Sequence, residues 1–264
     1  MKTSERGPGR VLATAAFGVI FFLQLPVLVV MLAAFSKTAY LTIPPQGLTL
    51  HWFDVVLRDS EYLSATWTSL WLACAATAAA LVLGLAAAYA LHRKMVPAAA
   101  ALTSVMMAPL ILPSVVLGVA LLQYYTLTGM RGNSIGLWLA HVVIAVPYVV
   151  RACLSSLASV DDALEDAAQV LGADGFTSFR LVTLPLVKSG LVAGGLFAFI
   201  TSLDNVPVSI FLLSASQTTL PVKIFTSVEQ GVDPSVAAVS TLLIVFTGIV
   251  LLLAERWTGF HKHV

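Results

Sequence analysis

Three features of the sequence carry side chains suited to chemistry. Asp204 is a carboxylate inside a long apolar run, where an ionised group is stable only beside water, a partner or a ligand. The segment 132–136 reads Gly-Asn-Ser-Ile-Gly, the spacing around a serine hydrolase nucleophile, and His141 follows it. An acidic cluster that begins at Asp161 precedes a stretch rich in alanine. What each feature can do depends on the element that holds it.

Composition indicates a membrane protein. The chain has 264 residues, of which 59% are hydrophobic and 10% charged, and a mean hydropathy of +0.94. A soluble domain carries about 25% charged residues, so much of this surface must face lipid. The net charge of +1 gives no reason to expect nucleic-acid binding. Cys74 and Cys153 lie in or beside apolar runs, and we expect neither a disulfide nor a metal site.

Six apolar stretches approach the length of about 20 residues that a membrane helix needs. They are Val11–Phe35, Leu63–Leu91, Pro97–Tyr125, Ile135–Val150, Ser189–Leu213 and Ser235–Ala254. The first charge-free run, from Val11 to Ser36, exceeds the roughly 7–15 residues of a signal-peptide core, so it predicts a membrane helix. The expected fold class is therefore an all-α polytopic membrane protein with six transmembrane helices.

The distribution of basic residues predicts the orientation. Ten of the 14 Lys and Arg residues fall on the side of the N-terminus: Lys2, Arg6, Arg10, Arg93, Lys94, Arg151, Arg180, Lys188, Arg256 and Lys262. The other four are Lys37, Arg58, Arg131 and Lys223. Because short cytoplasmic segments are enriched in Lys and Arg, both termini are expected in the cytoplasm. The layout is then a cytoplasmic N-terminus (1–10), a first membrane helix (11–35), an external loop (36–62), a core (63–254) and a cytoplasmic tail (255–264).

The largest predicted cytoplasmic segment, 152–188, has the pattern of two short helices. Its acids gather at the start, which suits a helix N-terminus. Apolar residues then recur at helical spacing up to Leu171, and Gly172 follows, where a helix would stop. A second helix, Phe176–Val182, is expected to end before Leu184.

The same segment contains a motif. It reads Asp166-Ala167-Ala168, three residues, Gly172, nine residues, then Val182-Thr183-Leu184-Pro185. This resembles the EAA signature of binding-protein-dependent importer permeases, which is Glu-Ala-Ala, three residues, Gly, nine residues, Ile, any residue and Leu-Pro. The departures at Asp166 and Val182 keep the charge and the β-branched shape.

The resemblance implies a type I ABC importer permease fold, with one N-terminal helix, a five-helix core and a cytoplasmic coupling helix that docks on an ATPase subunit. The residues that it assigns to ATPase coupling are Glu165, Asp166, Ala167, Ala168, Gly172, Ala173, Val182, Leu184 and Pro185. The implied partners are two cytoplasmic ATPase subunits, a second homologous permease and a periplasmic or extracellular solute-binding protein, in a bacterial inner membrane. The chain has no Gly-x-x-x-x-Gly-Lys-Ser/Thr segment. We therefore expect ATP and Mg²⁺ in the partner subunits, no cofactor or metal on this chain, and no catalysis by it.

Three further segments indicate the solute. Residues Ile43–Phe53 look like the first external loop of the polyamine branch of these permeases, and Ser202–Asn205 with Thr219–Phe225 is similar to the fifth-helix region of spermidine/putrescine permeases. The resemblance implies a small amine-bearing solute, with a polyamine first and an opine or aminophosphonate as the alternative.

Asp204 and Asn205 are the candidates for the substrate pathway. Asp204 lies about 24 Å past Lys188 along a helix, which places it in the outer half of the membrane. It either attracts a cationic solute or anchors a broken helix near Pro207 through hydrogen bonds. Asn205 suits either role.

Two other function classes remain to be compared. An ion-coupled secondary transporter would usually show inverted repeats, and none is apparent in the sequence. An intramembrane serine protease needs the Gly-x-Ser-x-Gly motif on a strand–turn–helix elbow, whereas here it precedes a predicted membrane helix.

Overall fold

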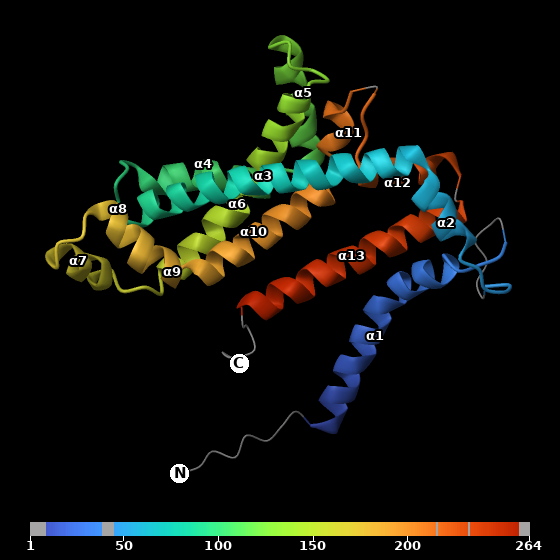
Figure 1. Cartoon of the computed structure of the whole chain (residues 1–264), viewed down its shortest axis with the longest axis horizontal. Coiled ribbons are helices and arrows are strands. Elements are labelled where there is room, and N and C mark those ends of the chain that lie inside the picture. Colours follow the sequence, from blue (N-terminus) through green and yellow to red (C-terminus); the bar gives the residue numbers. More distant parts are fainter. Residues whose placement is uncertain (1–8, 39–44, 215, 232, 259–264) are drawn as a thin grey trace. The chain divides into compact units, whose positions relative to one another are not determined.

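The computed structural model describes residues 9–38, 45–214, 216–231 and 233–258. In these ranges the chain is helical without a β-sheet, and one isolated bridge joins Ser36 to Leu48. The all-α class is confirmed (Figure 1). Residues 39–44 of the predicted external loop, residues 1–8 and most of the predicted tail lie outside the described residues.

The long helices are α1 (Arg10–Ala33), α3 (Ser60–His92), α6 (Ser134–Leu157), α10 (Lys188–Leu203) and α13 (Pro234–Thr258). The shorter ones are α2 (His51–Arg58), α4 (Ala99–Ile111), α5 (Ser114–Leu127), α7 (Ala163–Val170), α8 (Gly175–Ser178), the π-helix η1 (Phe179–Thr183), α9 (Leu184–Leu186), α11 (Ser209–Leu212) and α12 (Leu220–Gln230). Among the described residues, α1, α3, α6 and α13 are each long and apolar enough to cross a bilayer. Two further pairs, α4 with α5 and the segment Gly175–Leu186 with α10, are bent, and the number of spans reaches six if each pair is counted as one.

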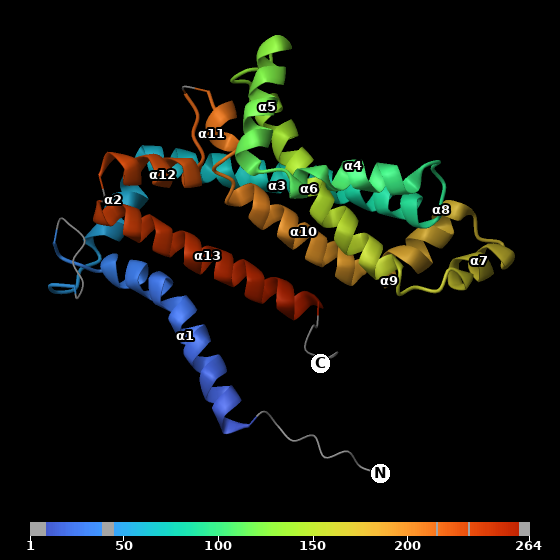
Figure 2. The same ribbon diagram turned by 180° about the vertical axis from the view of Figure 1, so that it is seen from behind.

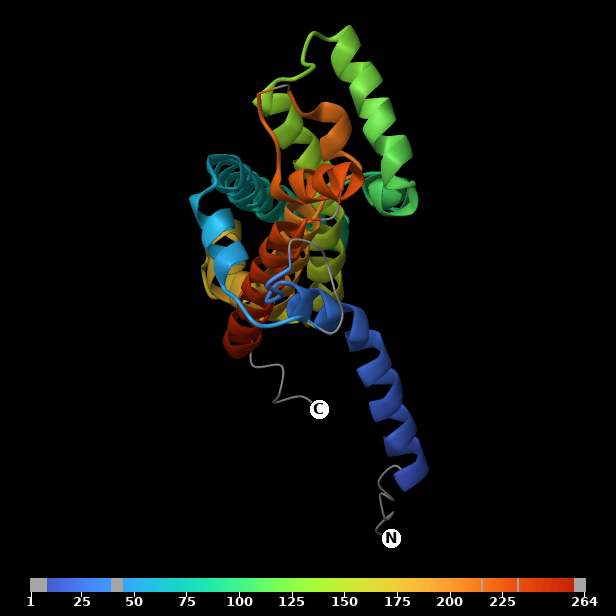
Figure 3. The same cartoon turned by 90° about the vertical axis from the view of Figure 1, so that its right-hand side faces the viewer.

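The third predicted span, Pro97–Tyr125, is not one straight helix. It consists of α4 and α5, which meet at 105°. Figure 3 shows α5 rising from the end of α4. Pro113 lies at the junction, and a proline disfavours helical conformation in the residue before it, here the extended Leu112.

Contacts divide the chain into two units, 1–59 with 226–245 and 60–225 with 246–264. In the first unit the indole N–H of Trp52 donates to the backbone oxygen of Ser36 at 2.9 Å, and the rings of Phe35 and Phe53 lie 5.1 Å apart. These contacts join α2 to the segment that follows α1. All candidate site residues belong to the second unit.

The centre of the second unit is the packing of α3, α6 and α10, which lie side by side in Figures 1 and 2. Val149 of α6 is fully buried where the three helices meet. A Cβ on Gly84 of α3 would lie 2.7 Å from Cβ of Val149, and one on Gly194 of α10 would lie 2.9 Å from its Cα. Only glycine permits such close approach, a common device between membrane helices.

The fourth predicted span, Ile135–Val150, is longer than expected. Helix α6 continues to Leu157, so the first residues of the predicted 152–188 loop are helical. The loop proper therefore runs from residue 158 to 187, between α6 and α10, and we call it the 158–187 loop.

Candidate functional site

The 158–187 loop folds as a helix, a turn and a second helical segment. A carboxylate oxygen of Asp161 accepts from the backbone N–H of Ala163 at 3.0 Å at the start of α7. Gly172 has φ +96°, a conformation that L side chains rarely adopt, and it forms the turn predicted there. Asp174 then accepts from the backbone N–H of Thr177 at the start of α8. Hydrogen bonds from the side chain and then the backbone of Thr177 lower the pKa of the Asp174 carboxyl.

The second helical segment does not end at Val182, which corrects the sequence-based expectation. It continues through η1 and α9 to Leu186, including Leu184 and Pro185. Pro185 is tolerated because it stands in the first turn of α9, where a backbone N–H has no required helical partner.

Glu165 is the buried residue of α7, with 5% of its surface exposed. The Tyr89 hydroxyl of α3 donates to Oε1 of Glu165, and the Thr183 hydroxyl of η1 donates to Oε2 at 2.5 Å. The ring of Tyr89 also meets Phe179 edge-on at 4.9 Å between centroids. Both carboxylate oxygens thus have partners from different elements, and α7 is fixed to the end of α3 and to η1.

A second group of contacts joins the end of α3 to α7 at the surface. Nη2 of Arg93 lies 2.9 Å from Oδ1 of Asp166, and Nη1 lies 3.5 Å from Oδ1 of Asp162. His92 Nε2 is 3.0 Å from that Asp162 oxygen. The hydrogen bond to Asp166 raises the pKa of the Arg93 guanidinium, which stays charged. Because both carboxylates are more than half exposed, each pair contributes at most about 1 kcal/mol.

The loop also exposes large apolar side chains, which we call its open apolar face. Their exposed fractions are Leu164 50%, Val170 88%, Leu171 89%, Phe176 69%, Leu181 62% and Leu186 45%. Ala167 is exposed and Ala168 half-buried, so a partner could approach the α7 backbone closely. The loop therefore buries one acid, Glu165, against the bundle and exposes several large apolar side chains, unlike an ordinary surface helix.

The remaining motif residues lie in the same 158–187 loop. Ala173, Val182 and Leu184 are half-buried, and Pro185 is exposed. The sequence did not identify Tyr89, Arg93 and Thr183 as partners of the motif. A signal was present, since Tyr89, His92 and Arg93 form a polar cluster at the end of the second span, on the side where basic residues gather.

Asp204 and Asn205 lie at the other end of α10, away from the 158–187 loop. Asp204 follows the last residue of that helix and is exposed. The Asn205 side chain accepts from the backbone N–H of Val208 at 2.9 Å, immediately before the short α11. Figure 2 shows α11 at one end of α10 and α9, with α7 beyond it, at the other. The structure does not bring the two groups of candidates together.

The serine hydrolase pattern does not form a catalytic site. The hydroxyl of Ser134 donates to Gln217 at 3.1 Å, within the first turn of α6. His141 bonds Ser202 and Ser209 instead of Ser134. The motif also starts a helix rather than a strand–turn–helix elbow, so the protease interpretation is wrong.

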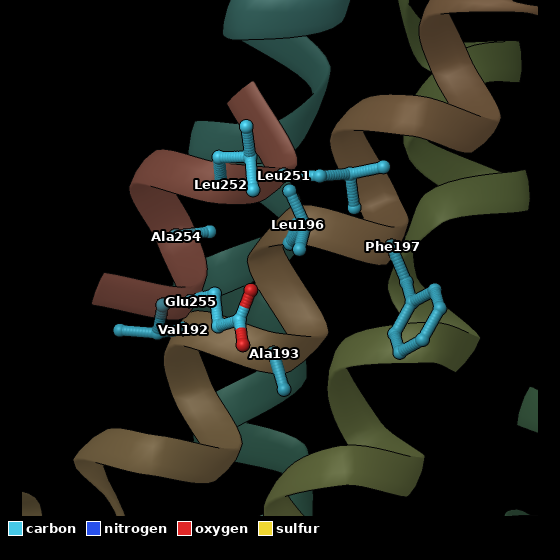
Figure 4. Close-up of a pocket in the computed structure, with 8 residues that line it drawn as sticks. All are labelled: Val192, Ala193, Leu196, Phe197, Leu251, Leu252, Ala254 and Glu255. Atoms are coloured by element: carbon cyan, nitrogen blue, oxygen red, sulfur yellow. The ribbon is translucent and has the colours of Figure 1, made fainter. Parts of the chain in front are cut away.

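A cavity of about 270 Å³ lies between α10 and residues 251–255 of α13. Figure 4 shows its lining residues: Val192, Ala193, Leu196, Phe197, Leu251, Leu252, Ala254 and Glu255. Glu255 is the one charged side chain of this lining, so the cavity lacks the convergent polar groups of a ligand site. In the described part of the chain no group of three His, Cys, Asp or Glu side chains is placed to hold a metal.

Comparison with known proteins identifies the relatives of the chain. The family model described as "Binding-protein-dependent transport system inner membrane component" matches residues 80–259. The chain is 33% identical to the putrescine transport system permease protein PotI of Escherichia coli K12, over 88% of this chain and 85% of PotI. It is 31% identical to the spermidine/putrescine transport system permease protein PotC of Haemophilus influenzae, over 94% and 96%. PhnV of Salmonella paratyphi A, a candidate 2-aminoethylphosphonate transport system permease, is 29% identical over 95% and 94%.

Solved structures show the same fold. A chain of a bacterial ABC transporter involved in the import of the acidic polysaccharide alginate superposes with a TM-score of 0.76. The match covers 97% of this chain and 98% of that one, at 16% sequence identity. A bacterial alginate ABC transporter in complex with a periplasmic protein that holds an alginate pentasaccharide gives a TM-score of 0.66 at 14% identity, over 96% and 93%.

Proposed function

Because the chain belongs to the family of binding-protein-dependent transport system inner membrane components, we propose that it forms half of the membrane pathway of an ATP-driven importer for a polyamine. The observation that carries the proposal is how the 158–187 loop is exposed on one side and attached to the bundle on the other. Its apolar face is open, while the buried Glu165 ties α7 to α3 and η1. A protein that grips the open face can pull on the bundle through these contacts.

The partner on the open face is a cytoplasmic ATPase subunit. Two such subunits, each with its ATP and Mg²⁺, act on this chain and on a second, homologous permease. A periplasmic solute-binding protein delivers the solute to the other side. This assignment requires both termini and residues 152–188 in the cytoplasm, residues 36–62 outside, and a permease core at 63–254. ATP hydrolysis belongs to the partners, and this chain contributes the pathway.

Two lines of support favour a polyamine. PotI and PotC, named for putrescine and spermidine, match most of the chain. Asp204 also supplies an exposed carboxylate at the end of α10, and a carboxylate attracts a polycation. The alternative solute is an aminophosphonate, supported by PhnV. A phosphonate carries negative charge, which Asp204 would repel.

Reconstituted transport tests the proposal. The complete complex, with its ATPase, second permease and binding protein, is placed in proteoliposomes with ATP inside or outside and labelled putrescine. We expect uptake that requires ATP on the ATPase side and that excess spermidine inhibits. Inhibition by 2-aminoethylphosphonate but not by spermidine would move the assignment to the alternative solute. Uptake driven by an ion gradient without ATP would contradict the importer.

A further inference from the structure

His141 lies two turns into α6 and is completely buried. Its two ring nitrogens bond two serines that are seven positions apart in the sequence. Nδ1 lies 2.8 Å from Oγ of Ser202, at the end of α10, and Nε2 lies 3.0 Å from Oγ of Ser209, at the start of α11. One imidazole therefore holds both sides of the break between these helices.

The proton count settles the direction of these bonds. The Ser209 hydroxyl donates to the backbone oxygen of Asn205 at 2.6 Å, so its single proton is used there. Ser209 must then accept from His141, which places the ring proton on Nε2. In a neutral imidazole Nδ1 is left as the acceptor, and the Ser202 hydroxyl donates to it. Every polar atom of this small network has its partner inside the bundle.

The segment held in this way, residues 202–209, contains Asp204. Within it the Asn205 side chain accepts from the backbone N–H of Val208, and the backbone oxygen of Asn205 is linked through Ser209 to the imidazole. Helix α5 lies against the same segment, since a Cβ on Gly118 would come within 2.8 Å of the backbone oxygen of Pro207. The backbone on both sides of Asp204 is thus fixed, although the side chain itself is exposed.

We propose that His141 is a positioning residue that sets where the Asp204 carboxylate stands for a cationic solute. The inference rests on the proposed function, in which Asp204 faces the solute pathway. If His141 only filled the core, its loss would destabilise the bundle, and the effect on solute binding would not depend on Asp204. If His141 positions Asp204, its loss weakens solute binding only while the Asp204 carboxylate is present.

A double-mutant cycle separates the two roles. His141→Phe keeps an aromatic ring but loses both bonds to the serines. In the reconstituted complex we expect His141→Phe to raise the KM for putrescine about fivefold and to leave the maximal rate within about twofold of the wild type. In an Asp204→Asn background the same substitution should change KM by less than twofold. An equal rise in both backgrounds would overturn the inference. The control is Val149→Ala, a buried change on α6 outside the network, whose effect should be the same in both backgrounds.

A second measurement does not depend on the identity of the solute. Asp204→Cys is made with Cys74→Ser, since Cys74 is exposed and Cys153 is buried. We expect His141→Phe to change the rate at which a charged, water-soluble thiol reagent modifies position 204 by at least threefold, and Val149→Ala to leave it unchanged. An unchanged rate with His141→Phe would refute the positioning role even if uptake of putrescine is confirmed. A changed rate in a complex that does not carry putrescine supports the positioning and contradicts only the proposed solute.

Discussion

Glu165 and Asp166 are consecutive acids with opposite environments. Glu165 is buried and accepts from two hydroxyls, whereas the side chain of Asp166 is 64% exposed and pairs with Arg93. The residue that aligns with the glutamate of the EAA signature is Asp166. The residue that fixes the loop to the bundle is its neighbour.

We expect Glu165→Ala to lower ATP-driven uptake about tenfold. The change removes the acceptor of Tyr89 and Thr183, and the orphaned hydroxyl of the buried Thr183 costs about 1–3 kcal/mol. The loop then transmits less of the partner's motion. The measurement is uptake and ATP hydrolysis by the same complex, and we expect hydrolysis to be retained more fully than uptake.

The matched control is Asp166→Asn in the adjacent position. It breaks an exposed ion pair, worth about 0–1 kcal/mol, so uptake should change by less than threefold. A larger loss from Asp166→Asn than from Glu165→Ala would mean that the exposed acid, and not the buried one, carries the coupling.

For individual residues, the sequence predicted which segment contains the candidate coupling site, but it did not predict the side-chain contacts within it. The spacing of the motif from Asp166 to Pro185 found the loop. It gave no indication that Glu165 would be buried, because its burial depends on Tyr89, 76 positions earlier in the chain. Asp204 was identified from its charge in an apolar run, yet the support from His141 arises from contacts between α6, α10 and α11.

Among the elements, α7 depends on the turn at Gly172. Its φ of +96° disfavours any side chain, while a Cβ there would meet no atom within 4 Å. We expect Gly172→Ala to cost about 1–2 kcal/mol in the turn and to lower uptake about fivefold, with normal insertion in the membrane. Gly172→Asp should abolish uptake.

Gly175 provides a control in the same loop. It also has open space around its Cα, and its φ is outside the left-handed range, so Gly175→Ala should leave uptake within about twofold of the wild type. Equal losses of uptake from the two alanine substitutions would show that the partner requires small residues at these positions rather than the turn at Gly172.

The packing of α10 on α6 gives a prediction about stability. A Cβ on Gly190 would lie 2.5 Å from Cβ of Ser156 and 2.8 Å from the backbone oxygen of Ala152. Gly190→Ala should therefore destabilise the bundle by about 1–3 kcal/mol, seen as a lower Tm of the detergent-solubilised protein. Gly195→Ala on the same helix meets only the flexible end of Leu81, at 3.0 Å, and should change Tm much less.

The helices were predicted better than their bends. Apolar runs located the long helices α1, α3, α6 and α13, because about 20 apolar residues leave few alternatives to a membrane helix. The predicted fifth span, Ser189–Leu213, is instead interrupted after Leu203. The 105° angle between α4 and α5 was not predictable, since Pro113 marks a break without fixing its direction. The continuation of the loop helix past Pro185 was missed because proline was taken as a stop, whereas it also starts helices.

At the scale of the second unit, α10 connects the two groups of candidate residues. Its 16 residues rise about 24 Å, with α9 and the 158–187 loop before Lys188 and Asp204 after Leu203. Helix α3, with 33 residues, is about 50 Å long and exceeds the roughly 30 Å hydrocarbon layer. This extra length allows its end at His92 to reach the 158–187 loop, so force on α7 acts directly on α3 through Tyr89 and Glu165.

The proposed coupling to an ATPase requires the 158–187 loop and the turn at 128–133 to lie on opposite sides of the membrane, because α6 is the helix that joins them along the chain. We test this with single cysteines, Gly175→Cys and Asn133→Cys, each combined with Cys74→Ser. Both positions are exposed. In intact cells a membrane-impermeant maleimide should label position 133, and position 175 only after permeabilisation. The reverse pattern would place the open apolar face outside the cell, where no ATP-hydrolysing partner could bind it, and the proposed coupling would be wrong whatever solute is carried.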